Sequence, residues 1–119
     1  MRSLRMLGNS QVQIVDEPDP IPGPGEVLVR NAVSVICGSE MHTYRHSGQE
    51  QGNPGHESAG VVAALGEGVT NLKVGQRVGV SAVAGCGQCA NCLAGRYTWC
   101  SKPRVAGSQH AELVRTPAL

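Results

Sequence analysis

The chain has 119 residues, with 10 Lys and Arg against 9 Asp and Glu and a formal net charge of +1. This length suits a single domain and is too short for a catalytic domain with a separate dinucleotide-binding domain, which together need on the order of 250 residues. The near-neutral charge argues against nucleic acid and membranes as partners, and 16 Gly and 7 Pro with no Phe argue against a helical bundle.

A proline-rich lead-in precedes the predicted strands. Four prolines at alternate positions end this lead-in, which excludes a helix there and favours an extended segment leading into a turn. Runs rich in β-branched residues predict strands over 26–33, 58–65 and 77–83, and a shorter one over 111–114. Gly60, inside the second of these strands, predicts a bulge or a close approach between backbones.

The expected compartment follows from what the sequence lacks. No apolar run approaches the roughly 18 residues of a transmembrane helix. The basic N-terminus is not followed by the apolar segment of a secretory signal. We therefore expect a cytoplasmic protein whose five cysteines stay reduced and available for metal binding or catalysis.

The stretch 85–103 has too few aliphatic residues for a core of its own, so a covalent or metal staple must order it. Its cysteines form a C-x2-C-x2-C-x7-C array, and this spacing suits the four thiolates of a tetrahedral zinc ion. Four thiolates leave no open coordination position, so the predicted zinc is structural. The alternatives are two disulfides or a cysteine-ligated iron–sulfur cluster. The four residues are Cys86, Cys89, Cys92 and Cys100.

A second constellation lies where two predicted strands end and begin. Cys37 follows the strand 26–33, and His56 and Glu57 precede the strand 58–65. If the strands are neighbours, a thiolate, an imidazole and a carboxylate meet in one pocket, as in a catalytic zinc site with room for substrate. From spacing alone, a buried free cysteine and a hydrogen-bonded core histidine are an equally good interpretation.

Several motifs in order resemble the zinc-dependent medium-chain dehydrogenases over nearly the whole chain. They are Cys37-Gly38-Ser39-Glu40-x-His42, Gly55-His56-Glu57-x-Ala59-Gly60, Val74-Gly75-Gln76-Arg77-Val78 and the four-cysteine array. The resemblance implies a mainly β fold, the GroES-like distorted and partly open β-barrel of the amino-terminal catalytic domain of an alcohol or polyol dehydrogenase. It also implies a structural zinc in the cysteine lobe, 85–103.

The resemblance assigns roles to individual residues. It makes Cys37 and His56 ligands of a catalytic zinc, and Glu57 a third ligand or a residue that approaches the metal as ligands exchange. Glu40, where the family usually has Asp, would orient His56 from behind.

Proton transfer is assigned to two further residues. Ser39 would take the proton of the substrate hydroxyl, and His42 would continue the relay toward solvent. Hydride would then pass from the substrate to NAD or NADP. Three remaining residues are expected to be structural: His46 in a solvated loop, His110 packed at a strand start and Trp99 covering the cysteine lobe.

The match stops at Leu119, before the family's remaining catalytic-zinc ligand and its Rossmann domain. We therefore expect residues 1–119 to form an incomplete catalytic domain with negligible turnover and no tight binding of NAD alone. Unpaired strand edges would favour homo-oligomers. The expected partner is a small alcohol or polyol; a non-enzymatic zinc-binding module and a GroES-like assembly protein are the alternative functions.

Overall fold

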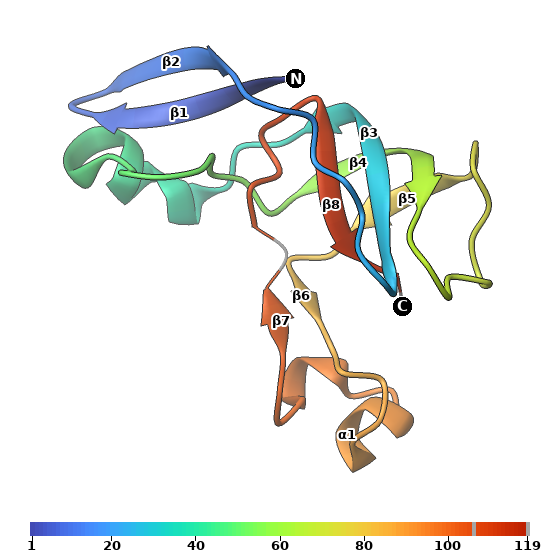
Figure 1. Cartoon of the computed structure of the whole chain (residues 1–119). Coiled ribbons are helices and arrows are strands. Elements are labelled where there is room, and N and C mark those ends of the chain that lie inside the picture. Colours follow the sequence, from blue (N-terminus) through green and yellow to red (C-terminus); the bar gives the residue numbers. More distant parts are fainter. Residues whose placement is uncertain (106, 119) are drawn as a thin grey trace.

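A four-stranded antiparallel sheet forms the centre of the protein (Figure 1). The computed structural model describes residues 1–105 and 107–118, and Leu119, the end of the predicted domain, lies outside the described residues. The strand order is β5-β4-β3-β8. The strands are β3 (Glu26–Ser34), β4 (Ser58–Leu65), β5 (Arg77–Val80) and β8 (Leu113–Pro117).

The predicted strands over 26–33 and 58–65 are confirmed, and the other two differ. The strand predicted over 77–83 ends at Val80, because the Ser81 hydroxyl binds the backbone of Val83 and turns the chain away from the sheet. The strand predicted over 111–114 begins two residues later, at Leu113. The segment before it is held as a loop, since the Asn31 amide donates to two of its carbonyls.

A hairpin that the proline-rich lead-in did not suggest covers one end of the sheet. Its strands are β1 (Arg2–Gly8) and β2 (Gln11–Asp16), joined by a turn in which Asn9 and Ser10 have positive φ angles of 51° and 60°. Two such residues match the two-residue hairpin turns that follow the twist of the strands.

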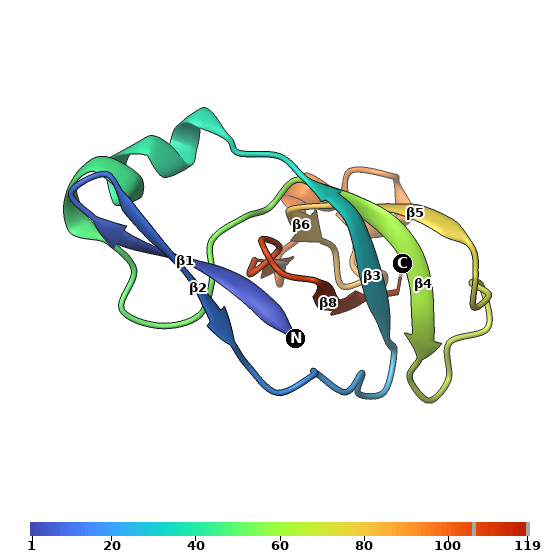
Figure 2. The ribbon, with the colours of Figure 1, turned by 90° about the horizontal axis from the view of Figure 1, so that it is seen from above.

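Two helical turns lie beside this hairpin, η1 (Gly38–Glu40) and η2 (Thr43–Ser47) (Figure 2). His46, expected in a solvated loop, is exposed but belongs to η2. The hairpin and η2 are in close contact, since a side chain on Gly8 would meet the backbone of His46 and Gly48. The helical turn η2, which follows Cys37 and η1 along the chain, is therefore attached to the hairpin.

The core is small and made of valines. Val27, Val29, Val80 and Val114 are buried together on the four-stranded sheet. Gly60 permits the tight pairing of β3 with β4, because a Cβ there would overlap the carbonyl oxygen of Arg30. The register also shifts near this position, so the predicted close approach is confirmed.

The cysteine lobe projects from the sheet on a short ribbon (Figure 1). The ribbon pairs β6 (Val83–Ala84) with β7 (Arg104–Val105), and the lobe itself contains α1 (Ala90–Leu93) and η3 (Tyr97–Trp99). The Trp99 side chain, expected to cover the lobe, is 76% exposed and therefore covers little of it. Among the described residues, no helix has the length and hydropathy needed to cross a bilayer.

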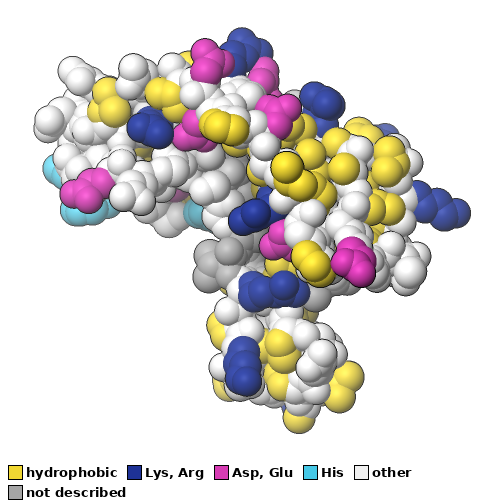
Figure 3. All heavy atoms as spheres, in the orientation of Figure 1, with side chains coloured by type: hydrophobic (Ala, Val, Ile, Leu, Met, Phe, Trp, Pro, Cys, Tyr) yellow, Lys and Arg dark blue, Asp and Glu magenta, His cyan; other side chains and the backbone are white. Residues whose placement is uncertain are grey.

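The mainly β, partly open architecture is confirmed. Across the described part of the chain the strands form three separate sheets, which do not close into a complete barrel. Charged side chains of both signs are interspersed over the hairpin and sheet. On the face of the lobe visible in Figure 3, the charged side chains are basic and lie among hydrophobic ones.

Candidate metal centres

The first candidate centre forms where β3 ends and β4 begins. The antiparallel pairing of these strands reaches its last pair at Ser34 and Ser58, and the Val35 N–H donates to the Glu57 carbonyl at 2.8 Å. This brings Cys37 beside His56 and Glu57. One ligand atom from each of the three lies within 4.8 Å of the others.

Hydrogen bonds prepare Cys37 to be a metal ligand. Donation from the Ser39 side chain and backbone, with a further bond to His56, lowers the pKa of the Cys37 thiol below its ordinary value of 9.0. The thiolate is the form that binds a metal ion. The structure thus brings Ser39 next to Cys37.

His42, the second residue of the predicted proton relay, lies one helical turn further on. Its side chain is exposed, and its ring centroid lies 5.1 Å from that of His46. An exposed imidazole is in contact with solvent and can exchange protons with it.

Glu40 is buried directly behind this centre. Its Oε2 accepts from the Cys37 N–H at 2.9 Å and contacts the His110 Nε2 at 3.1 Å. Its Oε1 lies 3.9 Å from the His56 Nδ1, which is too long for a hydrogen bond, and has no hydrogen-bond partner among the described residues. The carboxylate predicted to orient His56 is therefore beside it without binding it directly.

The donor set fits a zinc ion with an open position. Thiolate, imidazole and carboxylate are all zinc ligands, and three of them leave the fourth position for substrate or water. Metal-binding histidines commonly donate their second N–H to a carboxylate, and the unpartnered Oε1 of Glu40 is an acceptor at the right place for His56. An open cavity of about 460 Å³, lined in part by Ser39, Glu40 and His56, gives access to this side.

The second candidate centre is the cysteine lobe. All four sulfurs lie within 4.8 Å of one another, with Sγ–Sγ distances of 4.0 Å for Cys86 and Cys92 and 3.9 Å for Cys89 and Cys100. A disulfide needs about 2.05 Å, and all five cysteines of the chain are free. Zinc–sulfur bonds of about 2.3 Å place the sulfurs of a tetrahedron about 3.8 Å apart. The lobe therefore has the dimensions of a single tetrahedral ion.

Backbone N–H groups point at the lobe sulfurs. Cys86 and Lys102 both donate to the Cys100 Sγ at 3.3 Å, and Cys89 donates to the Cys86 Sγ at 3.4 Å. Backbone hydrogen bonds from Cys92 and Ser101 lower the pKa of Cys89 to about 6. Burial raises the pKa of Cys92 to about 11, so this thiol gives up its proton less readily than Cys89 does.

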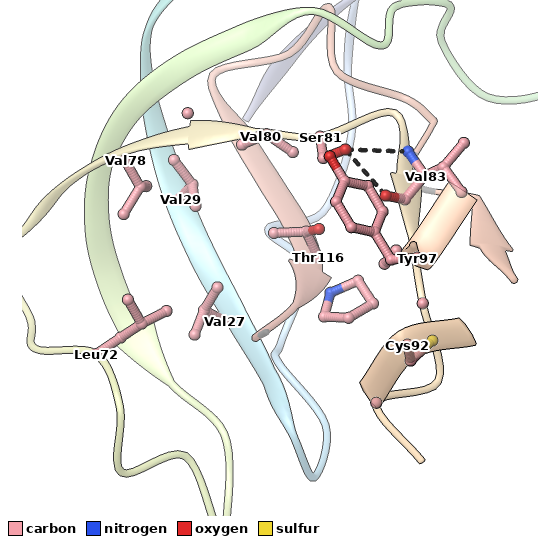
Figure 4. Close-up of a pocket in the computed structure, with 15 residues that line it drawn as sticks. Val27, Val29, Leu72, Val78, Val80, Ser81, Val83, Cys92, Tyr97 and Thr116 are labelled. Atoms are coloured by element: carbon pink, nitrogen blue, oxygen red, sulfur yellow. Dashed lines mark hydrogen bonds between the residues drawn. The ribbon is translucent and has the colours of Figure 1, made fainter. Parts of the chain in front are cut away.

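A larger apolar cavity, of about 510 Å³, separates the lobe from the sheet (Figure 4). Val27, Val29 and Val78 point into it from the sheet, and Tyr97 and Cys92 face it from the lobe. Cys37, His56 and Glu57 do not line it. Its walls are mainly apolar.

Sequence reasoning missed the contact partners of Glu40. His110 is 8% exposed, as expected for a packed residue, but its ring bonds to Glu40 on one side and Ser34 on the other. No local spacing reveals this, because 70 positions separate His110 from Glu40. Only the pairing of backbone segments brings them together.

Comparison with known proteins agrees with this fold. The family model described as “Alcohol dehydrogenase GroES-like domain” matches residues 23–119. Starvation-sensing protein RspB of Escherichia coli (strain K12) is 39% identical over 110 residues, covering 90% of this chain and 32% of that protein. Probable D-xylulose reductase A of Aspergillus clavatus is 38% identical over 113 residues, covering 89% of this chain and 32% of that protein.

A solved structure shares the same arrangement of strands. A short chain alcohol dehydrogenase (rspB) from E. coli CFT073, complexed with NADH, superposes with a TM-score of 0.82 at 36% identity, over 99% of this chain and 36% of that chain. The chain spans about a third of the length of the curated relatives it matches.

Proposed function

Because the chain belongs to the alcohol dehydrogenase GroES-like domain family, we propose that it supplies the zinc-binding catalytic half of a dehydrogenase. The reaction is the oxidation of an alcohol or polyol to a carbonyl compound, with hydride transfer to NAD or NADP. The observation that carries the proposal is the meeting of Cys37, His56 and Glu57, with ligand atoms within 4.8 Å of one another. Relatives named as an alcohol dehydrogenase and a xylulose reductase support the substrate class.

The residues around this centre have different roles. Cys37 and His56 hold the zinc, and Glu57 completes the set or exchanges with substrate. When bound, zinc supplies Lewis-acid polarisation of the substrate oxygen. Glu40, buried at 7% side-chain exposure, keeps His56 oriented.

Proton removal belongs to the exposed residues beside the centre. The Ser39 hydroxyl, next to Cys37, takes the proton of the substrate hydroxyl as it gives up its own proton to the relay, which His42 continues to solvent. Both side chains are exposed, which supports a path from the pocket to water. A bound nicotinamide cofactor would accept the hydride from the carbon that bears the substrate hydroxyl.

The cysteine lobe holds a second, structural zinc in this proposal. Four thiolates leave the ion no free position, so its effect is on folding and not on the reaction. The near-tetrahedral sulfur distances of 3.9–4.0 Å support the assignment.

Zinc content of three proteins tests both assignments. We expect two zinc ions per wild-type chain, one in Cys37→Ser, and loss of the lobe ion in Cys100→Ser, measured by elemental analysis after purification without added metal. Equal zinc content in wild type and Cys37→Ser would contradict the catalytic centre. Unchanged zinc in Cys100→Ser would contradict the structural one.

A further inference from the structure

The His110 ring is held rigidly next to the candidate catalytic centre. Its backbone N–H donates to the Pro54 carbonyl at 2.9 Å, and its carbonyl accepts from the Leu4 N–H at 2.9 Å. The ring lies against Gly55, where a Cβ would come within 2.7 Å of the His110 Nδ1. Gly55 immediately precedes His56, so the backbone of the metal ligand and the His110 ring are packed together.

Both nitrogens of this ring have partners. Nε2 lies 3.1 Å from the Glu40 Oε2, and Nδ1 bonds to the Ser34 hydroxyl. A carboxylate only accepts hydrogen bonds, so Nε2 carries the proton and Nδ1 accepts from Ser34 in the neutral ring. The Glu40 carboxylate therefore sets the tautomer, and the Ser34 hydroxyl satisfies the other ring nitrogen.

Glu40 in turn lies next to two of the three candidate ligands, Cys37 and His56. Its Oε2 binds the backbone N–H of Cys37 at 2.9 Å, and its Oε1 points toward His56 from 3.9 Å. Without His110, the Glu40 Oε2 would keep only the Cys37 N–H as a hydrogen-bond donor. The Glu40 side chain could then adopt more than one orientation. The donor from His110 removes this freedom.

We propose that His110 is a positioning residue of the catalytic zinc centre, which acts through Glu40 to keep His56 in its metal-binding orientation. The inference rests on the proposed function, because it requires a metal at Cys37 and His56. It goes beyond that function because it assigns Ser34, His110 and Glu40 to one hydrogen-bonded support beside a metal ligand.

Zinc affinity measured on the 119-residue chain tests this role without any activity assay. His110→Phe fills the same space without a donor, and His110→Gln restores an N–H near the position of Nε2. His46→Phe is the matched control, since His46 is an exposed histidine in η2 outside the support. Competition with a chelator of known affinity measures Kd at the Cys37 centre, and cobalt(II) absorption reports its geometry. Zinc in the lobe reports correct folding.

We expect His110→Phe to raise the Kd at the Cys37 centre on the order of 10- to 100-fold, as for other residues that support metal ligands. His110→Gln should stay within about threefold of wild type, and His46→Phe within about twofold. The cobalt(II) spectrum of the Cys37 centre should change in His110→Phe and be restored in His110→Gln.

A Kd in His110→Phe within twofold of wild type would overturn the inference, and so would His110→Gln binding as weakly as His110→Phe. If His110→Phe loses its lobe zinc, Ser34→Ala decides: a rise on the order of threefold supports the role, and an unchanged Kd overturns it. A wild-type chain that binds only the lobe zinc would instead overturn the proposed function, and this inference with it.

Discussion

At the scale of single residues, the backbone contact at Gly60 controls how closely β3 and β4 pair. A Cβ at this position would overlap the Arg30 carbonyl and would lie 2.9 Å from the Asn31 Cα. These are backbone atoms of a central strand, and they cannot move without disturbing the pairing that brings Cys37 to His56. Gly79, on the neighbouring β5, has open space where its Cβ would be.

The two glycines make a matched pair of variants. Gly60→Ala should destabilise the protein by about 2–3 kcal/mol, because the added methyl forces the backbones apart. Gly79→Ala should range from neutral to about 1 kcal/mol stabilising, since it mainly restricts the unfolded chain. Urea unfolding followed by circular dichroism measures both. Equal free energies of unfolding for the two variants would show that the contact at Gly60 relaxes at no cost.

At the scale of elements, the hairpin β1–β2 is fastened at its end by one carboxylate. Glu17 accepts from the Ser3 hydroxyl at 2.8 Å and pairs with Arg5 at 3.2 Å. These two hydrogen bonds lower the pKa of Glu17 below its ordinary value of 4.5. A carboxyl whose pKa is lower in the folded state stabilises the fold above its unfolded pKa.

This contribution should therefore disappear in acid. At pH 7 we expect Glu17→Gln to be less stable than wild type by roughly 0.5–1 kcal/mol, a value reduced by solvent screening of the partly exposed pair. The difference should shrink as the pH falls from about 4.5 through the lower pKa of folded Glu17. Urea midpoints at several pH values test this, with the exposed Glu67→Gln as control. A difference that stays constant down to pH 2 would contradict the role of the charge.

The same hairpin marks a limit of prediction from sequence. The prolines that end the lead-in favoured an extended segment, so no strands were predicted over residues 2–16. Asn9 and Ser10 nevertheless lie between two alternating apolar runs, which is a hairpin signal. The strands over 26–33 and 58–65 were predictable because their β-branched runs are bounded by glycine and turn residues. The break after Val80 was not, because it depends on one hydrogen-bonded turn at Ser81.

The residues of the candidate centre also differ in whether the sequence predicts them. Cys37 and His56 could be brought together by reasoning from sequence, because each lies a few residues from the end of a recognisable strand. Glu40 lies three residues after Cys37, and the sequence motif that contains both residues assigned it to the site. Ser34 and His110 could not be assigned, because their contacts arise from tertiary packing of segments 76 residues apart.

At the scale of the whole molecule, the sheet has a core of its own, and we propose that the lobe depends instead on a bound zinc ion. Between Gly85 and Arg104 the sequence has three basic residues and no acidic ones. A zinc ion with four thiolates would carry two negative charges, and these side chains have the opposite sign. The buried valines, in contrast, all belong to the four-stranded sheet.

Removing zinc should consequently unfold one part and leave the other. After treatment with a strong chelator, trypsin should cut first at Arg96 in the lobe, while Arg30 and Arg77 in the sheet strands stay protected. Mass spectrometry of the early fragments identifies the sites, and zinc added back should restore resistance in the lobe. Simultaneous cleavage in lobe and sheet would mean that the two parts unfold together.

The ribbon that carries the lobe has a consequence for how this fold can vary. Because Ala84 pairs with Arg104, the chain leaves and returns at one point, and the lobe is a loop whose ends are already joined. Closure entropy rises slowly with loop length, by about 0.6 kcal/mol for each doubling. Evolution can thus lengthen, shorten or replace the lobe without shifting the register of β3 on β4. The cysteine lobe and the strands that bring Cys37 to His56 are therefore free to diverge at different rates.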